Sequence, residues 1–238
     1  RGLRALQVDH GLHAASAAWA RHCVDFCKAL EVPLTVVRVE VEDSRGEGIE
    51  AAARRARRAA FAGHLRDGEW LVLGHHHDDQ VETVLLKLLR GAGPEGLGGM
   101  RALRPFARGF LWRPLLETPR GTLRKYLSEN ELTCVDDPAN ANPRFARNVL
   151  RAEILPRLAR YWPHAEASIL HSAQLCRAAA EYIDGDARTA LASLRRAGDT
   201  LDAAGVREVP DALRAPALDA WLHAHGFAHP PDGSRAEL

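Results

Sequence analysis

The sequence predicts an α/β fold in which helices flank a parallel β-sheet, followed by a helical connector and the start of a second domain. Short apolar segments alternate with longer segments of helical periodicity, the order typical of a parallel sheet covered by helices. Hydrophobic residues make up 46% of the 238 residues, which is enough for a substantial core. Polar clusters follow two of the apolar segments, at the strand ends where such sheets bind ligands.

The expected strands are short and apolar, as buried strands of a parallel sheet usually are. The first strand begins at Leu3 and runs into the polar sequence Asp9-His10-Gly11. The second follows Pro33 and is rich in β-branched residues, while the third ends at Gly74. The four expected strands cover residues 3–8, 34–41, 70–73 and 110–116.

The expected helices are longer and repeat apolar residues at helical spacing along one side. Gly91 is a typical C-terminal stop for the third of them. Thr118 is expected to cap the fourth helix, because Pro119 suits the first helical position. The expected helices cover residues 14–30, 48–65, 78–90, 119–132, 145–161 with a break at Pro156, and 165–184.

The order of these segments predicts three parts of the chain, of which residues 1–160 form the first, an α/β domain. A helical connector is expected over residues 161–187. From residue 188 to residue 238, glycines and prolines separate short segments, which indicates the start of a substrate-binding domain. The chain begins with Arg1 beside an apolar segment rather than with Met, so we expect it to start within a domain.

Composition narrows the possible classes of protein without identifying a partner. The formal net charge of +1 gives no sign of a nucleic-acid partner, and no apolar run is long enough to span a bilayer. Four cysteines without a C-x-x-C pair indicate scattered reduced thiols in a cytoplasmic protein. Only three of the 32 basic residues are lysines. Arginine suits phosphate recognition, although a coding bias toward arginine explains the excess equally well.

The most informative segment places three carboxylates at the start of an expected helix. Asp78, Asp79 and Glu82 lie at positions i, i+1 and i+4, and a single aspartate would suffice for capping. Carboxylates at a strand end can hold Mg²⁺ bound to a nucleotide. His75, His76 and His77 precede them, but consecutive side chains at a strand end point in different directions. We therefore do not expect the histidines to share one metal ion.

Residues 73–100 closely resemble the G-H-H-x-D-D-Q-x-E-T signature of tRNA(Ile)-lysidine synthetases, which are PP-loop ATP pyrophosphatases with a Rossmann-like fold. Further segments match the family in the same order. Residues 8–12 resemble its V-D-H-G-L sequence, residues 48–57 its E-x-x-A-R-x-x-R helix, and residues 137–151 its D-P-x-N and R-N-x-x-R element. Residues 113–116 match another stretch, R-P-L-L. Together these matches reach from residue 8 to about residue 158, and as a set they are highly specific.

The resemblance implies an ATP-dependent ligase that joins free L-lysine to the wobble cytidine of the CAU anticodon of tRNA(Ile). ATP and Mg²⁺ are the implied cofactors. The cytidine carbonyl oxygen attacks the α-phosphate and releases pyrophosphate, and the lysine amine then displaces AMP. The implied location is cytoplasmic, without a membrane partner, and a homodimer is an open expectation. Residues 1–160 would then be the catalytic domain, without its first strand and phosphate loop. Residues 188–238 would be the start of a tRNA-binding domain.

The resemblance also implies roles for individual residues. The expected catalytic residues are Asp79, Asp78, Glu82 and Arg54, and Asp79 is also the expected Mg²⁺ ligand. The expected nucleotide-binding residues are His10, Asp9, His75 and His76. The expected tRNA-binding residues are Arg57, Arg147, Asn148 and Arg151. Simpler roles stay open: Arg54 and Arg57 suit a solvated helix face, His10 suits a structural role, and Asn148 suits a hydrogen bond to a turn.

The chain departs from the family at several points. The phosphate loop S-G-G-x-D-S does not occur, so we expect residues 1–238 alone to bind ATP poorly and to be inactive. Arg58 stands where the family usually has Tyr, and Val149 where a basic residue is usual. Two alternatives remain: a 2-thiocytidine synthetase, whose C-x-x-C cysteines do not occur here, and a non-catalytic RNA-binding module.

Overall fold

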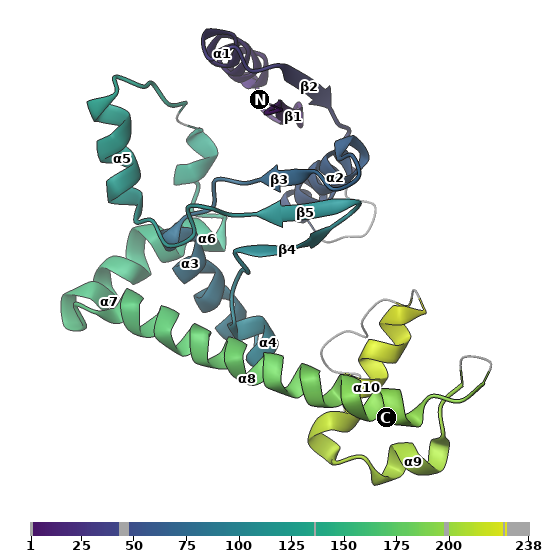
Figure 1. Ribbon diagram of the computed structural model, residues 1–238. Coiled ribbons are helices and arrows are strands. Elements are labelled where there is room, and N and C mark those ends of the chain that lie inside the picture. The colour runs from purple at the N-terminus through teal and green to yellow at the C-terminus, as the bar shows by residue number, and fades with distance from the viewer. Residues whose placement is uncertain (1, 43–47, 136, 198–199, 226, 228–238) are drawn as a thin grey trace. The chain divides into compact units, whose positions relative to one another are not determined.

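The computed structural model describes residues 2–42, 48–135, 137–197, 200–225 and 227. Tertiary contacts divide the chain into two compact units. Unit 1 comprises residues 1–75 and 102–137, and unit 2 comprises residues 76–101 and 138–238. The helices and strands alternate as the sequence predicts, and the α/β class is confirmed (Figure 1).

The first sheet of unit 1 has two parallel strands, β1 (Ala5–Asp9) and β2 (Leu34–Arg38). Asp9 at the end of β1 lies opposite Arg38 at the end of β2. Helix α1 (Ser16–Ala29) connects the two strands, as expected for a parallel pair. The described part of β2 ends earlier than expected, at Arg38 rather than at residue 41.

The second sheet of unit 1 has the order β3-β5-β4 and mixes two strand directions. Its strands are β3 (Trp70–Val72), β4 (Leu103–Phe106) and β5 (Gly109–Trp112). Strand β5 is parallel to β3 and antiparallel to β4. The sequence did not predict β4, because Pro105 argues against a strand; β4 is an edge strand, where proline is tolerated. Gly109 is required in this hairpin, since a Cβ there would lie 2.0 Å from the Glu69 carbonyl oxygen.

The core of unit 1 lies on one face of the second sheet. Leu65, Phe106 and Leu111 are buried there and pack against residues of α2 (Ile49–His64), including Phe61. Alternate residues of β3 and β5 point to the other face, as the two-residue period of a strand requires. That face carries the exposed rings of Trp70, Phe110 and Trp112. Helix α5 (Arg120–Glu129) completes the unit, and its N-cap is Pro119 without a side-chain hydrogen bond, so the expected Thr118 cap is wrong.

Unit 2 is built around α8 (Ala165–Leu194), the long helix that runs across Figure 1. Helices α3 (His77–Leu88) and α4 (Pro94–Leu97) contact its first part, and α10 (Asp211–Ala224), which follows α9 (Ala203–Glu208), packs on its last part. The helix runs ten residues beyond the expected end at residue 184. The helix continues through Gly185 because Ala187, Leu191 and Leu194 are buried, and this packing outweighs the low helix propensity of glycine.

The chain before α8 forms one continuous helical run over residues 146–161. It consists of α6 (Ala146–Val149), the π-helical turn η2 (Leu150–Ile154) and α7 (Leu155–Tyr161), after the short 3-10 turn η1 (Pro138–Ala141). The expected break at Pro156 is therefore replaced by a wider turn. Proline has no N–H and clashes with the carbonyl four residues earlier, and a π-turn relieves both effects without ending the helix. No helix in the described ranges is both long and apolar enough to cross a lipid bilayer.

Candidate active site

The candidate site is centred on the first two turns of α3 in unit 2. His76 is the N-cap of this helix and has an extended backbone. Asp79 Oδ2 accepts a hydrogen bond from the His76 backbone N–H at 3.1 Å, which closes the first turn in the manner of a capping box. Asp79 therefore does cap the helix, but its other oxygen, Oδ1, remains available and faces a cation.

Glu82 lies one turn further along α3 and is fully buried, with 0% of its side chain exposed. Its Oε1 accepts a hydrogen bond from Arg151 Nε at 2.7 Å, and its Oε2 lies 3.2 Å from Arg147 Nε. Burial raises the pKa of Glu82, and the two arginines oppose this rise. A buried carboxylate between two guanidinium groups is stable because each charge is compensated.

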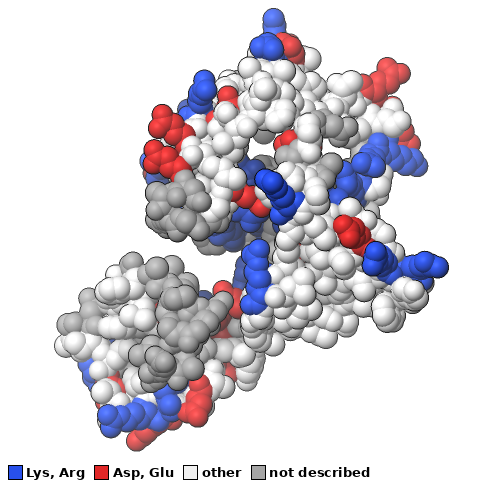
Figure 2. Space-filling model, turned by 180° about the vertical axis from the view of Figure 1, so that it is seen from behind, with Lys and Arg blue, Asp and Glu red and all other residues white. Residues whose placement is uncertain are grey.

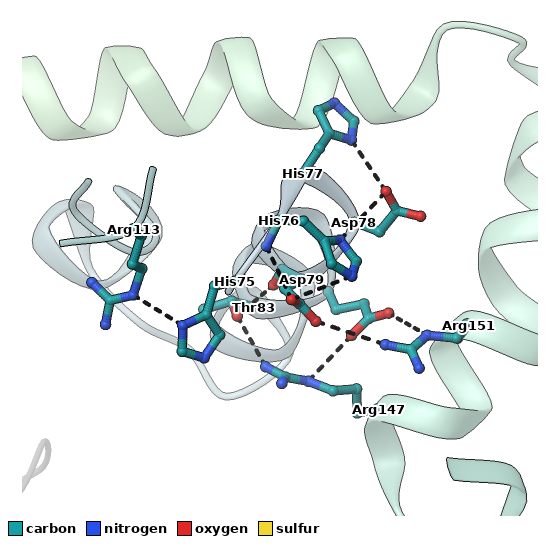
Figure 3. Close-up of polar contacts among 10 residues, drawn as sticks. His75, His76, His77, Asp78, Asp79, Thr83, Arg113, Arg147 and Arg151 are labelled. Carbon is teal, nitrogen blue, oxygen red and sulfur yellow. Dashed lines mark hydrogen bonds and ion pairs between the residues drawn. The ribbon is translucent and has the colours of Figure 1, made fainter. Parts of the chain in front are cut away.

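The same two arginines connect Glu82 to Asp79 and Thr83 (Figure 3). Arg151 Nη2 lies 3.7 Å from Asp79 Oδ1. Arg147 Nη2 donates to Thr83 Oγ1 at 3.1 Å, and Thr83 Oγ1 donates to the Asp79 carbonyl at 2.7 Å. About a quarter of each arginine side chain is exposed, 26% for Arg147 and 27% for Arg151. Both cations are thus held in place and still accessible to an anionic ligand.

The three consecutive histidines point in different directions, as predicted (Figure 3). In unit 1, His75 Nδ1 accepts a hydrogen bond from Arg113 Nε at 3.3 Å. In unit 2, His76 Nε2 lies 3.5 Å from Asp79 Oδ2, and His77 Nδ1 lies 3.8 Å from both Asp78 Oδ1 and Glu166 Oε2. Within the described ranges, no group of three or more His, Cys, Asp or Glu side chains is arranged to hold a metal ion.

The end of β1 in unit 1 carries the other expected polar cluster. Asp9 Oδ1 accepts a hydrogen bond from the Gly11 backbone N–H at 2.9 Å and stabilises the turn after the strand. Desolvation lowers the pKa of His10, the nearby charge of Arg57 lowers it further, and Asp9 opposes both. Arg54 on α2 is 61% exposed and contacts Glu50 at 4.0 Å, the spacing of a solvated helix face.

The Gly-rich segment after α3 is held by side chains of unit 2. Gln80 is buried and exchanges two hydrogen bonds with the Met100 backbone, at 2.9 and 2.8 Å. Gly99 has a φ of +70°, and a Cβ there would lie 2.8 Å from Gln80 Nε2, so glycine is required. The Arg177 guanidinium donates to the carbonyls of Gly98 and Met100. This segment is a structural loop beside α8.

The structure brings together about half of the residues that the sequence singled out. Unit 2 gathers six of them: His76, Asp78, Asp79, Glu82, Arg147 and Arg151. Asn148, on the same helical run, donates through Nδ2 to the Asn142 carbonyl at 2.8 Å, which is the turn role left open for it. The remaining five lie in unit 1: Asp9, His10, Arg54, Arg57 and His75.

Sequence reasoning gave no role to two residues that shape this site. Thr83 lies within the G-H-H-x-D-D-Q-x-E-T signature and joins Arg147 to the Asp79 carbonyl. Arg113 is buried and binds His75, from the R-P-L-L stretch that was noted only as a match. The sequence spacing that could have found Thr83 is i to i+4 from Asp79, the distance at which a threonine bonds back to the helix backbone.

Comparison with known proteins gives a consistent result. A family model described as the PP-loop domain matches residues 1–158. The tRNA(Ile)-lysidine synthase of Xanthomonas axonopodis pv. citri (strain 306) is 49% identical over 230 residues, which cover 97% of this chain and 52% of that protein. That of Chromobacterium violaceum is 43% identical over 238 residues, covering 100% of this chain and 54% of that protein. The chain thus spans about half the length of the curated relatives that it matches.

A solved structure shares the fold at low sequence identity. The U34-tRNA thiolase NcsA from Methanococcus maripaludis matches with a TM-score of 0.54 and 17% identity, over 71% of this chain and 59% of that one. At this identity the likeness concerns the fold alone. It supports the arrangement of strands and helices described above.

Proposed function

The chain belongs to the PP-loop domain family, and from this premise we propose that the complete protein is an ATP-dependent tRNA(Ile)-lysidine synthetase. In the proposed reaction, the carbonyl oxygen of the wobble cytidine bonds to the α-phosphorus of ATP, and pyrophosphate leaves. The amine of L-lysine then bonds to the activated base carbon, loses a proton, and AMP leaves with the oxygen. The protein must therefore stabilise phosphate charge and position a base and an amine.

The observation that carries the proposal is the buried cluster of Glu82, Arg147 and Arg151 beside Asp79. Glu82 fixes both guanidinium groups by their Nε atoms, and each arginine side chain keeps about a quarter of its surface exposed, 26% and 27%, where an anion can meet it. Cations held in advance of the reaction stabilise developing phosphate charge without a reorganisation cost. Arg147 and Arg151 are therefore proposed to contact the reacting nucleotide or tRNA phosphates.

Asp79 is the proposed catalytic carboxylate and a ligand of Mg²⁺. Mg²⁺ in nucleotide enzymes is commonly held by one or two carboxylates, with substrate phosphates and water completing its shell. The donor set fits this pattern, because Asp78 and Asp79 supply hard oxygen ligands at a helix start and no complete protein cage is needed. When bound, Mg²⁺ would offset the charge of the triphosphate. Asp78 Oδ1 also lies 3.7 Å from His76 Nδ1, so His76 would steady both carboxylates.

Several residues of unit 1 are proposed to bind the nucleotide. His10 and Asp9 lie at the carboxyl end of a parallel strand, the position at which α/β sheets bind ligands, and His75 follows β3. Burial and Arg57 keep His10 neutral to lower pH, which suits a hydrogen bond to a nucleotide base or sugar rather than a phosphate. Arg54 and Arg57 on α2 remain proposed contacts of the reacting nucleotide and of tRNA.

Residues 1–160 are proposed to be a catalytic domain whose first strand and phosphate loop are not among residues 1–238. Two observations support this division. In the described part of the chain, β1 and β3 each pair with a single strand, so one further strand between them would join both sheets. The Gly-rich segment near Gly98 has its carbonyls bound by Arg177 and follows a helix, which does not suit phosphate binding.

The remaining proposals concern partners and the later part of the chain. Residues 161–187 are proposed as a connector and residues 188–238 as the start of a tRNA-binding domain. Free L-lysine, tRNA(Ile) with a CAU anticodon and a second copy of the chain are the proposed partners, and the proposed location is the cytoplasm. The names of the relatives support the tRNA.

A tRNA thiolase is the alternative function, because the thiolase NcsA shares this fold. The 2-thiocytidine synthetases carry C-x-x-C cysteines, whereas Cys23, Cys27, Cys134 and Cys176 are free thiols and include no C-x-x-C pair. A non-catalytic RNA-binding module would have no need for arginines that a buried carboxylate holds in position beside two further carboxylates. Ligation therefore explains the site best.

The test is a reconstituted reaction with the full-length protein, CAU-anticodon tRNA(Ile), Mg-ATP and isotope-labelled L-lysine. Nucleoside analysis by mass spectrometry should show a cytidine whose mass has increased by one lysine less one water, with one pyrophosphate and one AMP per event. An unmodified cytidine contradicts the proposal, and a thiolated base with a sulfur donor supports the alternative. Calorimetric titration with Mg-ATP should show much weaker binding to residues 1–238 than to the full-length protein.

A further inference from the structure

The end of α7 exposes two aromatic rings beside two arginines. Tyr161 is 70% exposed and Trp162 is 63% exposed, and their ring centroids are 6.0 Å apart at a tilt of 57°. Exposure of a large ring to water is unfavourable, by roughly 25 cal/mol for each Å² of apolar area. Two adjacent rings exposed in this way indicate a surface that is covered when a partner binds.

The arginines of the same helix are arranged around these rings. The Arg160 guanidinium carbon lies 5.9 Å from the centre of the Tyr161 ring, which is within the range of a cation–π contact. Arg157 precedes Tyr161 by four residues, so the two side chains are neighbours on the helix surface. Both arginines are exposed.

Neither arginine is neutralised by the protein itself. In the residues that the structure describes, Arg157 and Arg160 form no ion pair with a carboxylate, although Glu153 lies one turn before Arg157. Other arginines of unit 2 are paired, such as Arg101 with Glu181 and Arg196 with Asp202. Acidic and basic side chains are also interspersed on the face shown in Figure 2. Arg157 and Arg160 beside the two tilted rings are thus a local excess of positive charge.

Tyr161 and the arginines of the candidate site lie on the same helical run, so the distance between them follows from helix geometry alone. Tyr161 and Arg151 lie on one continuous helical run, ten residues apart. At ~1.5 Å per residue this is about 15 Å along the axis. Successive stacked nucleotides in one strand are about 3.4 Å apart, so the separation corresponds to roughly four or five nucleotides. One RNA loop could therefore reach both places.

We infer that Arg157, Arg160, Tyr161 and Trp162 form a stacking platform for unpaired nucleotides of the tRNA substrate, an inference that rests on the proposed function. Unpaired bases in RNA stack on aromatic rings and on guanidinium planes, and the neighbouring phosphates are neutralised by arginine. The platform offers both groups at once. A protein partner would suit the rings but would leave the arginines unpaired unless it supplied acidic residues.

The test measures binding of a fluorescent CAU-anticodon tRNA(Ile) transcript to the full-length protein. The double variant Tyr161→Ala/Trp162→Ala should bind roughly tenfold more weakly or worse, since base stacking contributes about 1–3 kcal/mol per base. Tyr161→Phe/Trp162→Phe should restore most of the affinity, because both π faces remain. Tyr182→Ala is the matched control: Tyr182 is 73% exposed on α8 and should be replaceable without loss.

A second pair of variants keeps the inference testable if the aromatic variant fails to fold. In Arg157→Ala/Arg160→Ala, the slope of log affinity against log salt should flatten by about 0.7–0.9 for each lost phosphate contact. Wild-type affinity and salt slope in both double variants, with lysidine still formed, overturn the platform alone. Failure of the wild-type protein to bind this tRNA overturns both the platform and the proposed function. If both double variants bind tRNA as the wild type does but no longer bind an acidic protein, the surface is a protein-binding site and the inference is overturned.

Discussion

The start of α3 and the end of β1 carry similar residues but are built in different ways. At the start of α3, Glu82 is fully buried and binds Arg147 and Arg151 at short distances. At the end of β1, Asp9 only stabilises its own turn. On α2 of the same unit, Arg54 contacts Glu50 at 4.0 Å, between exposed side chains.

The difference shows which polar residues are already organised by the fold. Buried charges must be compensated, so the geometry at α3 is fixed in advance and removal of one member affects the others. Exposed pairs contribute about 0–1 kcal/mol and leave their side chains mobile in water. An exposed residue such as Arg54 is therefore held only weakly by its ion pair, whereas the side chains at α3 are held in place by a buried partner.

Replacement of Glu82 should have the largest effect on stability. In Glu82→Ala, Arg147 and Arg151 lose their common buried partner, and breaking a buried ion pair in this way costs about 3–5 kcal/mol. Glu50→Ala removes an exposed helical partner of Arg54 and should cost no more than about 0.5 kcal/mol. Urea unfolding of the two variants measures this contrast. Equal effects would mean that the α3 cluster is not a compensated buried network.

Removal of one arginine should have an intermediate effect, because Glu82 keeps the other. Arg151→Ala should cost about 1.5–3 kcal/mol of unfolding free energy, the range for a hydrogen bond to a charged group. It should also weaken tRNA binding or adenylation in the full-length protein. Arg54→Ala should leave the unfolding free energy within about 0.5 kcal/mol of wild type. If Arg54→Ala is the more destabilising variant, the comparison between the two regions is wrong.

The contributions of Glu82 and His10 to folding stability should change with pH in opposite directions. Burial raises the folded-state pKa of Glu82 above 4.5, so the folded protein binds more protons there, and this contribution to stability is lost as pH rises through the folded pKa. Burial and Arg57 lower the folded-state pKa of His10 below 6.5, so its contribution is present above 6.5 and is lost as pH falls. Urea titrations of Glu82→Gln and His10→Gln against wild type should isolate slopes of opposite sign. If the stability of either variant changes with pH in parallel with that of the wild type, the replaced residue does not contribute to the pH dependence.

The smallest expected effect concerns the charge of Arg57 on His10. Arg57→Ala should raise the pKa of His10 only part of the way back to 6.5, because desolvation rather than Arg57 is the largest cause of the shift. Asp9→Asn should lower the His10 pKa further, since Asp9 opposes the shift. Nuclear magnetic resonance titration of the imidazole measures both changes. Full recovery in Arg57→Ala would mean that His10 is not desolvated.

Local periodicity was enough to predict most elements of the fold, because each is stabilised by its own pattern of apolar residues. Helix α3 has Val81 and Val84 on its buried side, and its boundaries lie within two residues of those expected. Strand β4 was missed because Pro105 is acceptable only at an edge, and edge position depends on the whole sheet. The π-turn was missed because it forms only where the helix continues through Pro156, and whether the helix continues depends on its packing.

The candidate site was only partly predictable, because its contacts join residues that are far apart in the sequence. The signature identified Asp79 and Glu82. It did not show that Asp79 caps α3 or that Glu82 is buried between two arginines. Arg147 lies 64 residues from Thr83 along the chain, and the contact between them depends on how α6 packs beside α3. Glu82 was expected to be catalytic, and this stays a prediction; because Glu82 is completely buried, we propose that it acts by positioning the two arginines. Whether Asp79 meets substrate stays a prediction.

The most direct measurement of the central claim is the rate of tRNA-dependent pyrophosphate release by the full-length Asp79→Asn variant. Asparagine keeps the shape and the oxygen that accepts the His76 N–H, so the helix cap should survive while the charge beside Arg151 is lost. We expect the rate to fall by about 10²–10³, the range for loss of one preorganised electrostatic contact, with an unchanged urea midpoint. A folded Asp79→Asn enzyme with a near-wild-type rate would contradict the assignment of the active site to the start of α3.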